Sequence, residues 1–178
     1  MNATIRNAAG IISVAAIAVG LSVSGAAWAQ QKKTVNFSIP ASSTKYTQQV
    51  TIDVGDAPGH QVRVFEIQRL YKTDAPVIEG LRLKESWTRG MTDFTELSGL
   101  GMSYMTMIAE NGDKIYARGN FIAQSVGKGG LRNAAVQTIT GGTGKFQGIR
   151  GIVKSEIYAE PAAGINQVKS DLEYWMEK

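Results

Sequence analysis

The chain contains no cysteine and only one histidine, His60, among its 178 residues. The missing cysteine excludes disulfides, thiol catalysis and thiolate metal sites. A lone histidine beside Pro58 and Gly59 leaves too few ligands for a zinc site, and no Gly-x-Ser-x-Gly motif supports a catalytic serine. We therefore predict no metal and no cofactor.

Concentrated positive charge and long helical patterns are also missing. The formal net charge is +4, and Lys, Arg, Asp and Glu are mixed along the chain. A nucleic-acid-binding domain normally shows a basic stripe, so we expect no nucleic-acid partner. Apolar residues repeating every 3.6 positions, which are typical of helices, do not occur beyond residue 30.

Residues 1–29 have the composition of a secretory signal peptide. Arg6 is the only charge in front of the apolar stretch 8–23, and small residues precede Ala29. The alternative is a retained transmembrane anchor, but a span needs about 20 apolar residues and this stretch is marginal in length. We therefore predict cleavage after Ala29, a periplasmic or secreted mature protein, and no stable membrane span after cleavage.

The rest of the chain predicts one β-rich domain. Residues 30–45 form a polar N-terminal arm with a short alternating segment, and residues 46–178 form a single domain. Alternating segments of about ten residues are separated by turn signals, a rhythm typical of an antiparallel barrel or sandwich. We expect eight strands, over residues 48–54, 60–71, 80–89, 99–109, 114–123, 131–140, 149–159 and 167–176.

A glycine-rich stretch at residues 138–151 interrupts this rhythm. It holds five glycines, which allow the backbone to turn and to approach other backbone closely. The pattern predicts the end of a strand, a tight corner bracing Phe146, and a new strand that begins at Ile149.

The corner at residues 141–146, Gly-Gly-Thr-Gly-Lys-Phe, resembles that of the allene oxide cyclase and dirigent barrel proteins. The strand-turn-strand segment 107–116 and the aromatic-ended last strand extend the resemblance loosely over residues 102–176. The resemblance implies an all-β, eight-stranded antiparallel β-barrel of the calycin type, in a bacterial exported member of this superfamily. It also implies a mostly apolar lumen and, in many members, assembly as a trimer.

The catalytic residues of the plant members of this superfamily cannot be matched to residues of this chain. The plant members cyclise an epoxide or steer the coupling of phenoxy radicals, but the cysteine of the cyclase site and the acidic pocket motifs of dirigent proteins have no counterpart here. The resemblance therefore implies fold more than activity. Another calycin-like barrel is the alternative, although the Gly-x-Trp of lipocalins is not found.

The strand expected at residues 80–89 carries the main candidate site. Glu85 and Arg89 share one alternation face with Leu81, Leu83 and Trp87. If that face lines the barrel, a carboxylate and a guanidinium lie among apolar walls, and a desolvated glutamate is suited to proton transfer. The alternative is that Glu85 is a structural partner of an arginine.

Four further residues complete the candidate site. Glu66, on the strand before that of Glu85, is a second candidate for proton transfer. Met102, Tyr104 and Tyr174 are expected in the ligand-binding wall. The two tyrosines could offer hydroxyl groups to a ligand. Aromatic residues in strands are more often part of a core, and that alternative stays open.

An eight-stranded barrel is wide enough to be filled by side chains or to hold one small ligand. We therefore expect an exported barrel that binds a small apolar or amphipathic molecule in its lumen. One alternative is a cyclase or isomerase in which Glu85 or Glu66 transfers a proton. Another is a structural barrel with a filled core. By resemblance, a homotrimer is expected.

Overall fold

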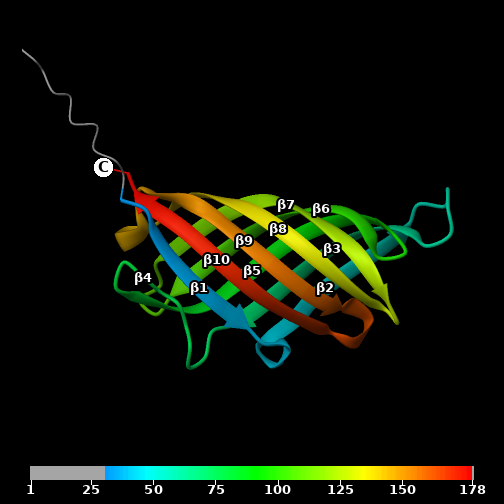
Figure 1. Ribbon diagram of the computed structural model, residues 1–178, viewed down its shortest axis with the longest axis horizontal. Helices are drawn as coiled ribbons and strands as arrows, with labels where there is room; N and C mark the ends of the chain where they lie inside the picture. Colours follow the sequence, from blue (N-terminus) through cyan, green and yellow to red (C-terminus); the bar gives the residue numbers. More distant parts are fainter. Residues whose placement is uncertain (1–30, 178) are drawn as a thin grey trace, which may run out of the picture.

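The computed structural model describes residues 31–177 as one curled antiparallel sheet (Figure 1). Its strands follow the order β1-β10-β9-β8-β7-β6-β5-β3-β2, and β4 pairs with β5 outside this path. The elements are β1 (Lys33–Ile39), η1 (Ala41–Ser43), β2 (Thr44–Asp53), β3 (His60–Leu70), β4 (Val77–Ile78), β5 (Leu81–Thr95), β6 (Ser98–Ala109), β7 (Lys114–Gly127), β8 (Gly130–Gly142), η2 (Gly144–Phe146), β9 (Ile149–Glu160), η3 (Pro161–Ala163) and β10 (Ile165–Met176).

The predicted all-β antiparallel barrel is confirmed, and each of the eight expected strands is present. Two strands come in addition. The segment 33–39 of the expected polar arm forms β1, which pairs with β10 so that Phe37 lies opposite Ser170. The two-residue β4 pairs with the start of β5. The sheet therefore includes most of the residues expected as an arm.

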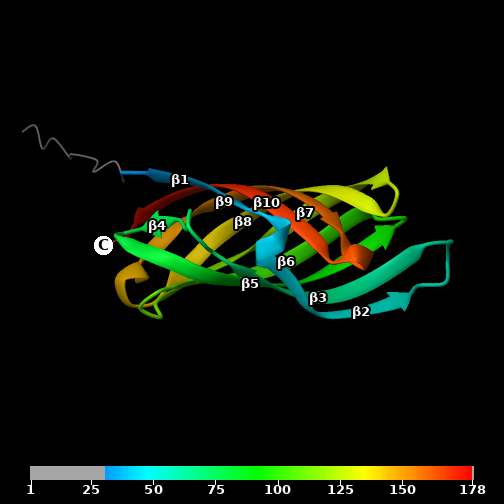
Figure 2. The ribbon, with the colours of Figure 1, turned by 90° about the horizontal axis from the view of Figure 1, so that it is seen from below.

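β1 and β2 are the two edge strands, and the chain crosses from one to the other through η1 (Figure 2). Side chains tie the strands near this seam. Asn166 of β10 accepts a hydrogen bond from Arg69 of β3 at 2.9 Å and donates one to the hydroxyl of Tyr46 in β2 at 3.1 Å. These side-chain contacts link strands on both sides of the seam. The backbone pairing itself runs continuously from β1 at one edge to β2 at the other.

One end of the barrel is closed by a dense apolar cluster. Phe146, Leu172 and Ile139 are fully buried in it, and the η2 corner presents Phe146 to the interior. The corner needs glycine because Gly144 has a φ of +54°, and a Cβ there would also overlap the carboxylate of Asp113. The tight corner predicted from the glycine-rich stretch is therefore confirmed.

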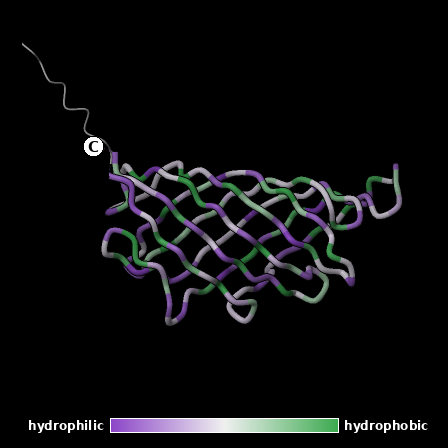
Figure 3. The backbone as a smooth tube through the Cα atoms, in the orientation of Figure 1, coloured by the Kyte–Doolittle hydropathy of each residue, from purple (hydrophilic) through white to green (hydrophobic). Residues whose placement is uncertain are grey.

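A second apolar cluster lies toward the other end, around Phe65, Phe94 and Phe121. Figure 3 shows polar and apolar residues alternating along the strands between the two ends. The signal peptide predicted for residues 1–29 falls outside the described residues. Within residues 31–177, no helix combines the length and the apolar character needed to span a bilayer.

Candidate functional site

A cavity of about 80 Å³ lies inside the barrel and is bordered by both apolar clusters. At about 10–15 Å³ for each water molecule, this space would hold roughly five to eight waters or a small organic group. Aromatic and aliphatic side chains form part of the wall, and hydroxyl, amide and guanidinium groups form the rest. The polar lining residues are Tyr46, Arg63, Arg69, Tyr71, Ser86, Thr88, Thr92, Ser103, Asn133, Gln137, Ser155, Asn166 and Ser170.

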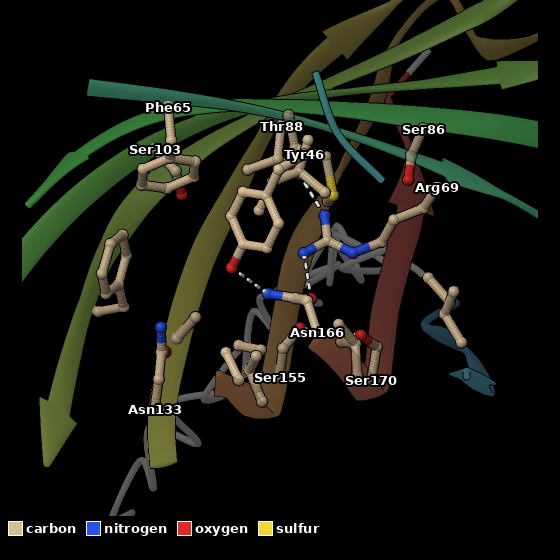
Figure 4. Close-up of a pocket in the computed structure, with 18 of the residues that line it drawn as sticks. Tyr46, Phe65, Arg69, Ser86, Thr88, Ser103, Asn133, Ser155, Asn166 and Ser170 are labelled. Carbon is tan, nitrogen blue, oxygen red and sulfur yellow. Dashed lines mark hydrogen bonds between the residues drawn. The ribbon is translucent and has the colours of Figure 1, made fainter. Parts of the chain in front are cut away.

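Arg69 lies at the centre of the polar part of the wall (Figure 4). Arg69 is only 7% exposed. The guanidinium donates to the Thr88 hydroxyl at 2.8 Å and to the Asn166 side-chain oxygen at 2.9 Å. Asn166 in turn donates to Tyr46, so four strands, β2, β3, β5 and β10, meet at one polar network inside the barrel.

Other polar groups of the cavity pair with each other across neighbouring strands. The hydroxyl groups of Ser155 and Ser170 lie 2.8 Å apart, and the amide of Gln137 donates to Ser103 at 3.0 Å. The side-chain oxygen of Asn133 is buried and has no hydrogen-bond partner among the described residues. The cavity can therefore offer both donors and acceptors to a bound molecule.

Burial sets the electrostatics of the site. Desolvation lowers the pKa of Arg69, and it also lowers the pKa of Arg63, which lines the cavity on the same strand. Burial raises the pKa of the Tyr71 hydroxyl, which therefore stays protonated at neutral pH. In the part of the chain that the structure describes, no Asp or Glu side chain lines the cavity.

A β-bulge in β5 shows that the orientation expected for Glu85 was wrong. The register with β6 shifts between Leu83 and Glu85, so Lys84 is an extra residue and the alternation inverts there. Leu83 is fully buried, but from Ser86 onward the even-numbered residues point inward. Glu85 consequently does not line the cavity, and it accepts a hydrogen bond from Gln68 at 2.8 Å.

The other charged candidates lie on the same outward face. Glu66 forms an ion pair with Arg89 at 2.8 Å and accepts a hydrogen bond from Thr47 at 2.7 Å. Arg89 also lies 5.6 Å from the ring centroid of Trp87. Neither Glu66, Arg89 nor Trp87 lines the cavity, so the structure groups them as an outer ion-pair and cation–π cluster.

The apolar candidates divide between the outer surface and the closed end. On β6, Ser103 and Met105 line the cavity, which places Met102 and Tyr104 on the opposite face, and Tyr104 is 54% exposed. Tyr174 and Leu83 are buried in the cluster that closes the barrel, and Leu81 packs against it. These three side chains point inward but lie outside the cavity lining.

The residues that do build the cavity were missed because its middle layer is polar. Serines and threonines on β5, β6, β9 and β10 point inward, and on β5 and β6 apolar side chains such as Met91 and Tyr104 are exposed on the outward face. One signal was present in the sequence. Arg63 and Arg69 share the alternation face of Phe65 and Ile67, so two arginines belong to an otherwise apolar face.

Among residues 31–177, no group of three His, Asp or Glu side chains is arranged to hold a metal ion. His60 begins β3 and lies between two carboxylates, with its Nε2 atom 2.7 Å from Asp93 and its Nδ1 atom bonded to Asp56. The hydrogen bond with Asp93 and then that with Asp56 raise the pKa of His60. This cluster lies outside the cavity lining.

Comparison with solved structures agrees with the barrel. The pterocarpan synthase dirigent protein PsPTS1 superposes with a TM-score of 0.50 over 83% of this chain and 97% of that chain, at 17% sequence identity. The chain has a dirigent-type barrel fold. The fold resemblance stated from the sequence is thereby confirmed. At 17% sequence identity, the similarity to PsPTS1 shows the fold alone.

Two weaker superpositions accompany it. The pterocarpan synthase dirigent protein GePTS1 gives a TM-score of 0.48 at 17% identity, over 94% of this chain and 98% of that chain. Pyocyanin demethylase gives a TM-score of 0.42 at 16% identity, over 78% of this chain and 99% of that chain. No protein-family model matches the sequence, and no curated protein matches it.

Proposed function

We propose that this protein is exported and that its barrel binds a small amphipathic molecule in the lumen. The observation that carries the proposal is the cavity between the two apolar clusters, which is lined by aromatic rings on one side and by hydrogen-bonding groups on another. Binding sites for small molecules typically combine apolar walls with a few oriented polar groups. The cavity of this barrel has that composition.

The alternative of a proton-transferring cyclase or isomerase has less support. It needs a carboxylate at the cavity, and Glu66 and Glu85 are engaged on the outward face instead. The alternative of a completely filled core is disfavoured by the remaining space of about 80 Å³. Binding is therefore the function that the geometry supports best.

Native mass spectrometry of protein purified from its own host tests this proposal. We expect wild-type protein to retain a small molecule. Ala135→Leu extends a cavity-lining side chain into the lumen and should reduce retention, whereas Glu85→Gln changes an outward side chain and should not. Equal retention by all three proteins, or no retained molecule in any of them, would argue against a ligand in the lumen.

Self-association is a separate part of the proposal. The outer surface carries a continuous apolar row in which Val50, Val64, Met91 and Met102 are successive cross-strand neighbours. Val50 is 62% exposed and Val64 is 58% exposed. Exposed apolar rows of this kind commonly mark contact surfaces. We propose that a second copy of this chain covers the row, in keeping with the homotrimer that the resemblance implies.

A further inference from the structure

Arg69 is the most unusual group in the cavity, because it is a buried cation whose hydrogen-bonding capacity is only partly used. Two of its N–H groups bond to Thr88 and Asn166. Its Nε atom is buried and has no partner among the described residues. A guanidinium has five N–H donors, so the neighbouring side chains leave part of the fork unfilled.

Among residues 31–177, no carboxylate neutralises this charge. The ion pairs of residues 31–177 do not include Arg69, and no Asp or Glu lines the cavity. In the described part of the chain, the groups near Arg69 are hydroxyls and one amide, from Tyr46, Tyr71, Thr88 and Asn166. A buried charge without an opposite charge is costly, so the ligand-free barrel contains a site that an anion would stabilise.

We infer that Arg69 binds the carboxylate of the lumen ligand, which makes the ligand a small amphipathic carboxylic acid. This inference rests on the proposed function and specifies its ligand class. The planar fork of a guanidinium matches the two oxygens of a carboxylate. A single buried guanidinium compensates one negative charge, which suits a carboxylate monoanion and leaves the second charge of a phosphate monoester unpaired.

The rest of the cavity fits the apolar body of such a molecule. Ile67 and Phe65 follow Arg69 along the inward face of β3, and the rings of Phe65 and Phe94 each lie 6.4 Å from that of Phe121. At about 3.3 Å per residue, this face runs for roughly 20 Å from Arg69 to Arg63. Arg63, at the far end of this face, adds a second positive charge to the lining, which favours entry of an anion, but it lies too far from Arg69 to share one head group with it.

Calorimetric titration with cinnamate and with cinnamyl alcohol tests the inference, in a buffer free of carboxylate and phosphate. Because a hydrogen-bonded charge adds 1.5–3 kcal/mol, wild-type protein should bind cinnamate roughly tenfold to a hundredfold more tightly than the alcohol. Arg69→Met should abolish this preference. Arg118→Met removes an exposed arginine from another strand and should leave the preference intact.

A second measurement does not depend on a variant that folds. In the ¹⁵N NMR spectrum of wild-type protein, the Arg69 Nε–H signal should shift and become protected from exchange with cinnamate, but not with cinnamyl alcohol. If Arg69→Met retains the preference, or the alcohol binds as tightly as the acid, the anion site is refuted while lumen binding stands. If cinnamate leaves the Nε–H signal unchanged, the inference is also refuted. The proposed function fails separately, when native mass spectrometry finds no retained molecule.

Discussion

Phe146 is expected to be the main apolar plug of the closed end, and its removal should destabilise the whole barrel. Its side chain is fully buried within the cluster that also contains Tyr174. Truncating a buried Phe to Ala costs about 3–5 kcal/mol, from lost transfer free energy and from the cavity that remains. At about 2–4 °C for each kcal/mol in a domain near 150 residues, Phe146→Ala should lower the melting temperature by roughly 6–20 °C.

Thermal unfolding followed by circular dichroism measures this shift. Tyr116→Ala is the matched control, because it truncates an aromatic side chain that is 38% exposed, and surface changes usually alter stability by at most about 0.5 kcal/mol. Phe146 does not line the cavity, so Phe146→Ala should still bind cinnamate below its lowered melting temperature. If the two variants melt at the same temperature, the cluster around Phe146 does not hold the barrel together as argued.

Three further outcomes are expected. Gly144→Val should cost about 1–3 kcal/mol through its φ of +54° and more through overlap with Asp113, and an unchanged melting temperature would contradict the strain. His60 has a raised pKa when folded, so its contribution to stability is full below about pH 6.5 and is lost as pH rises through the folded pKa. Melting temperatures of wild type and His60→Gln should therefore converge at high pH, and a gap independent of pH would contradict this. Val64→Lys should reduce the mass measured by sedimentation relative to Val126→Lys, which changes another exposed valine; equal masses would leave the outer apolar row without a partner.

The fold was predictable because hairpin order and strand rhythm are local properties. Turn residues such as Asn111-Gly112 separate the strands, and the structure places a hairpin turn there, with the Gly112 N–H donating to Ala109 at 3.0 Å. The glycines around Phe146 likewise indicated a corner, because few other residues accept a φ of +54°. Both features depend on a few neighbouring residues.

The candidate site was less predictable, because which side chains of a strand point into the barrel depends on how that strand pairs with its neighbours. The bulge at Lys84 arises in the pairing of β5 with β6, and it moves Ser86 rather than Glu85 into the barrel. Because the middle layer of the cavity is polar, the sequence does not show the usual alternation of inward apolar and outward polar residues there. Alternation alone therefore assigned Trp87 to the lumen, although it lies on the opposite face from Ser86.

The sequence by itself determined the class of fold, the number and order of the main strands and the corner at Phe146, since turn chemistry and period-two alternation act within short segments. Only the tertiary structure decided which face of each strand surrounds the lumen and which residues meet there. Tyr46 and Arg69 come from the paired strands β2 and β3, whereas Asn166 lies 97 residues beyond Arg69 along the chain, in β10, and its contacts with both exist only once the sheet has curled. A buried arginine without a carboxylate partner becomes visible only in that curled sheet.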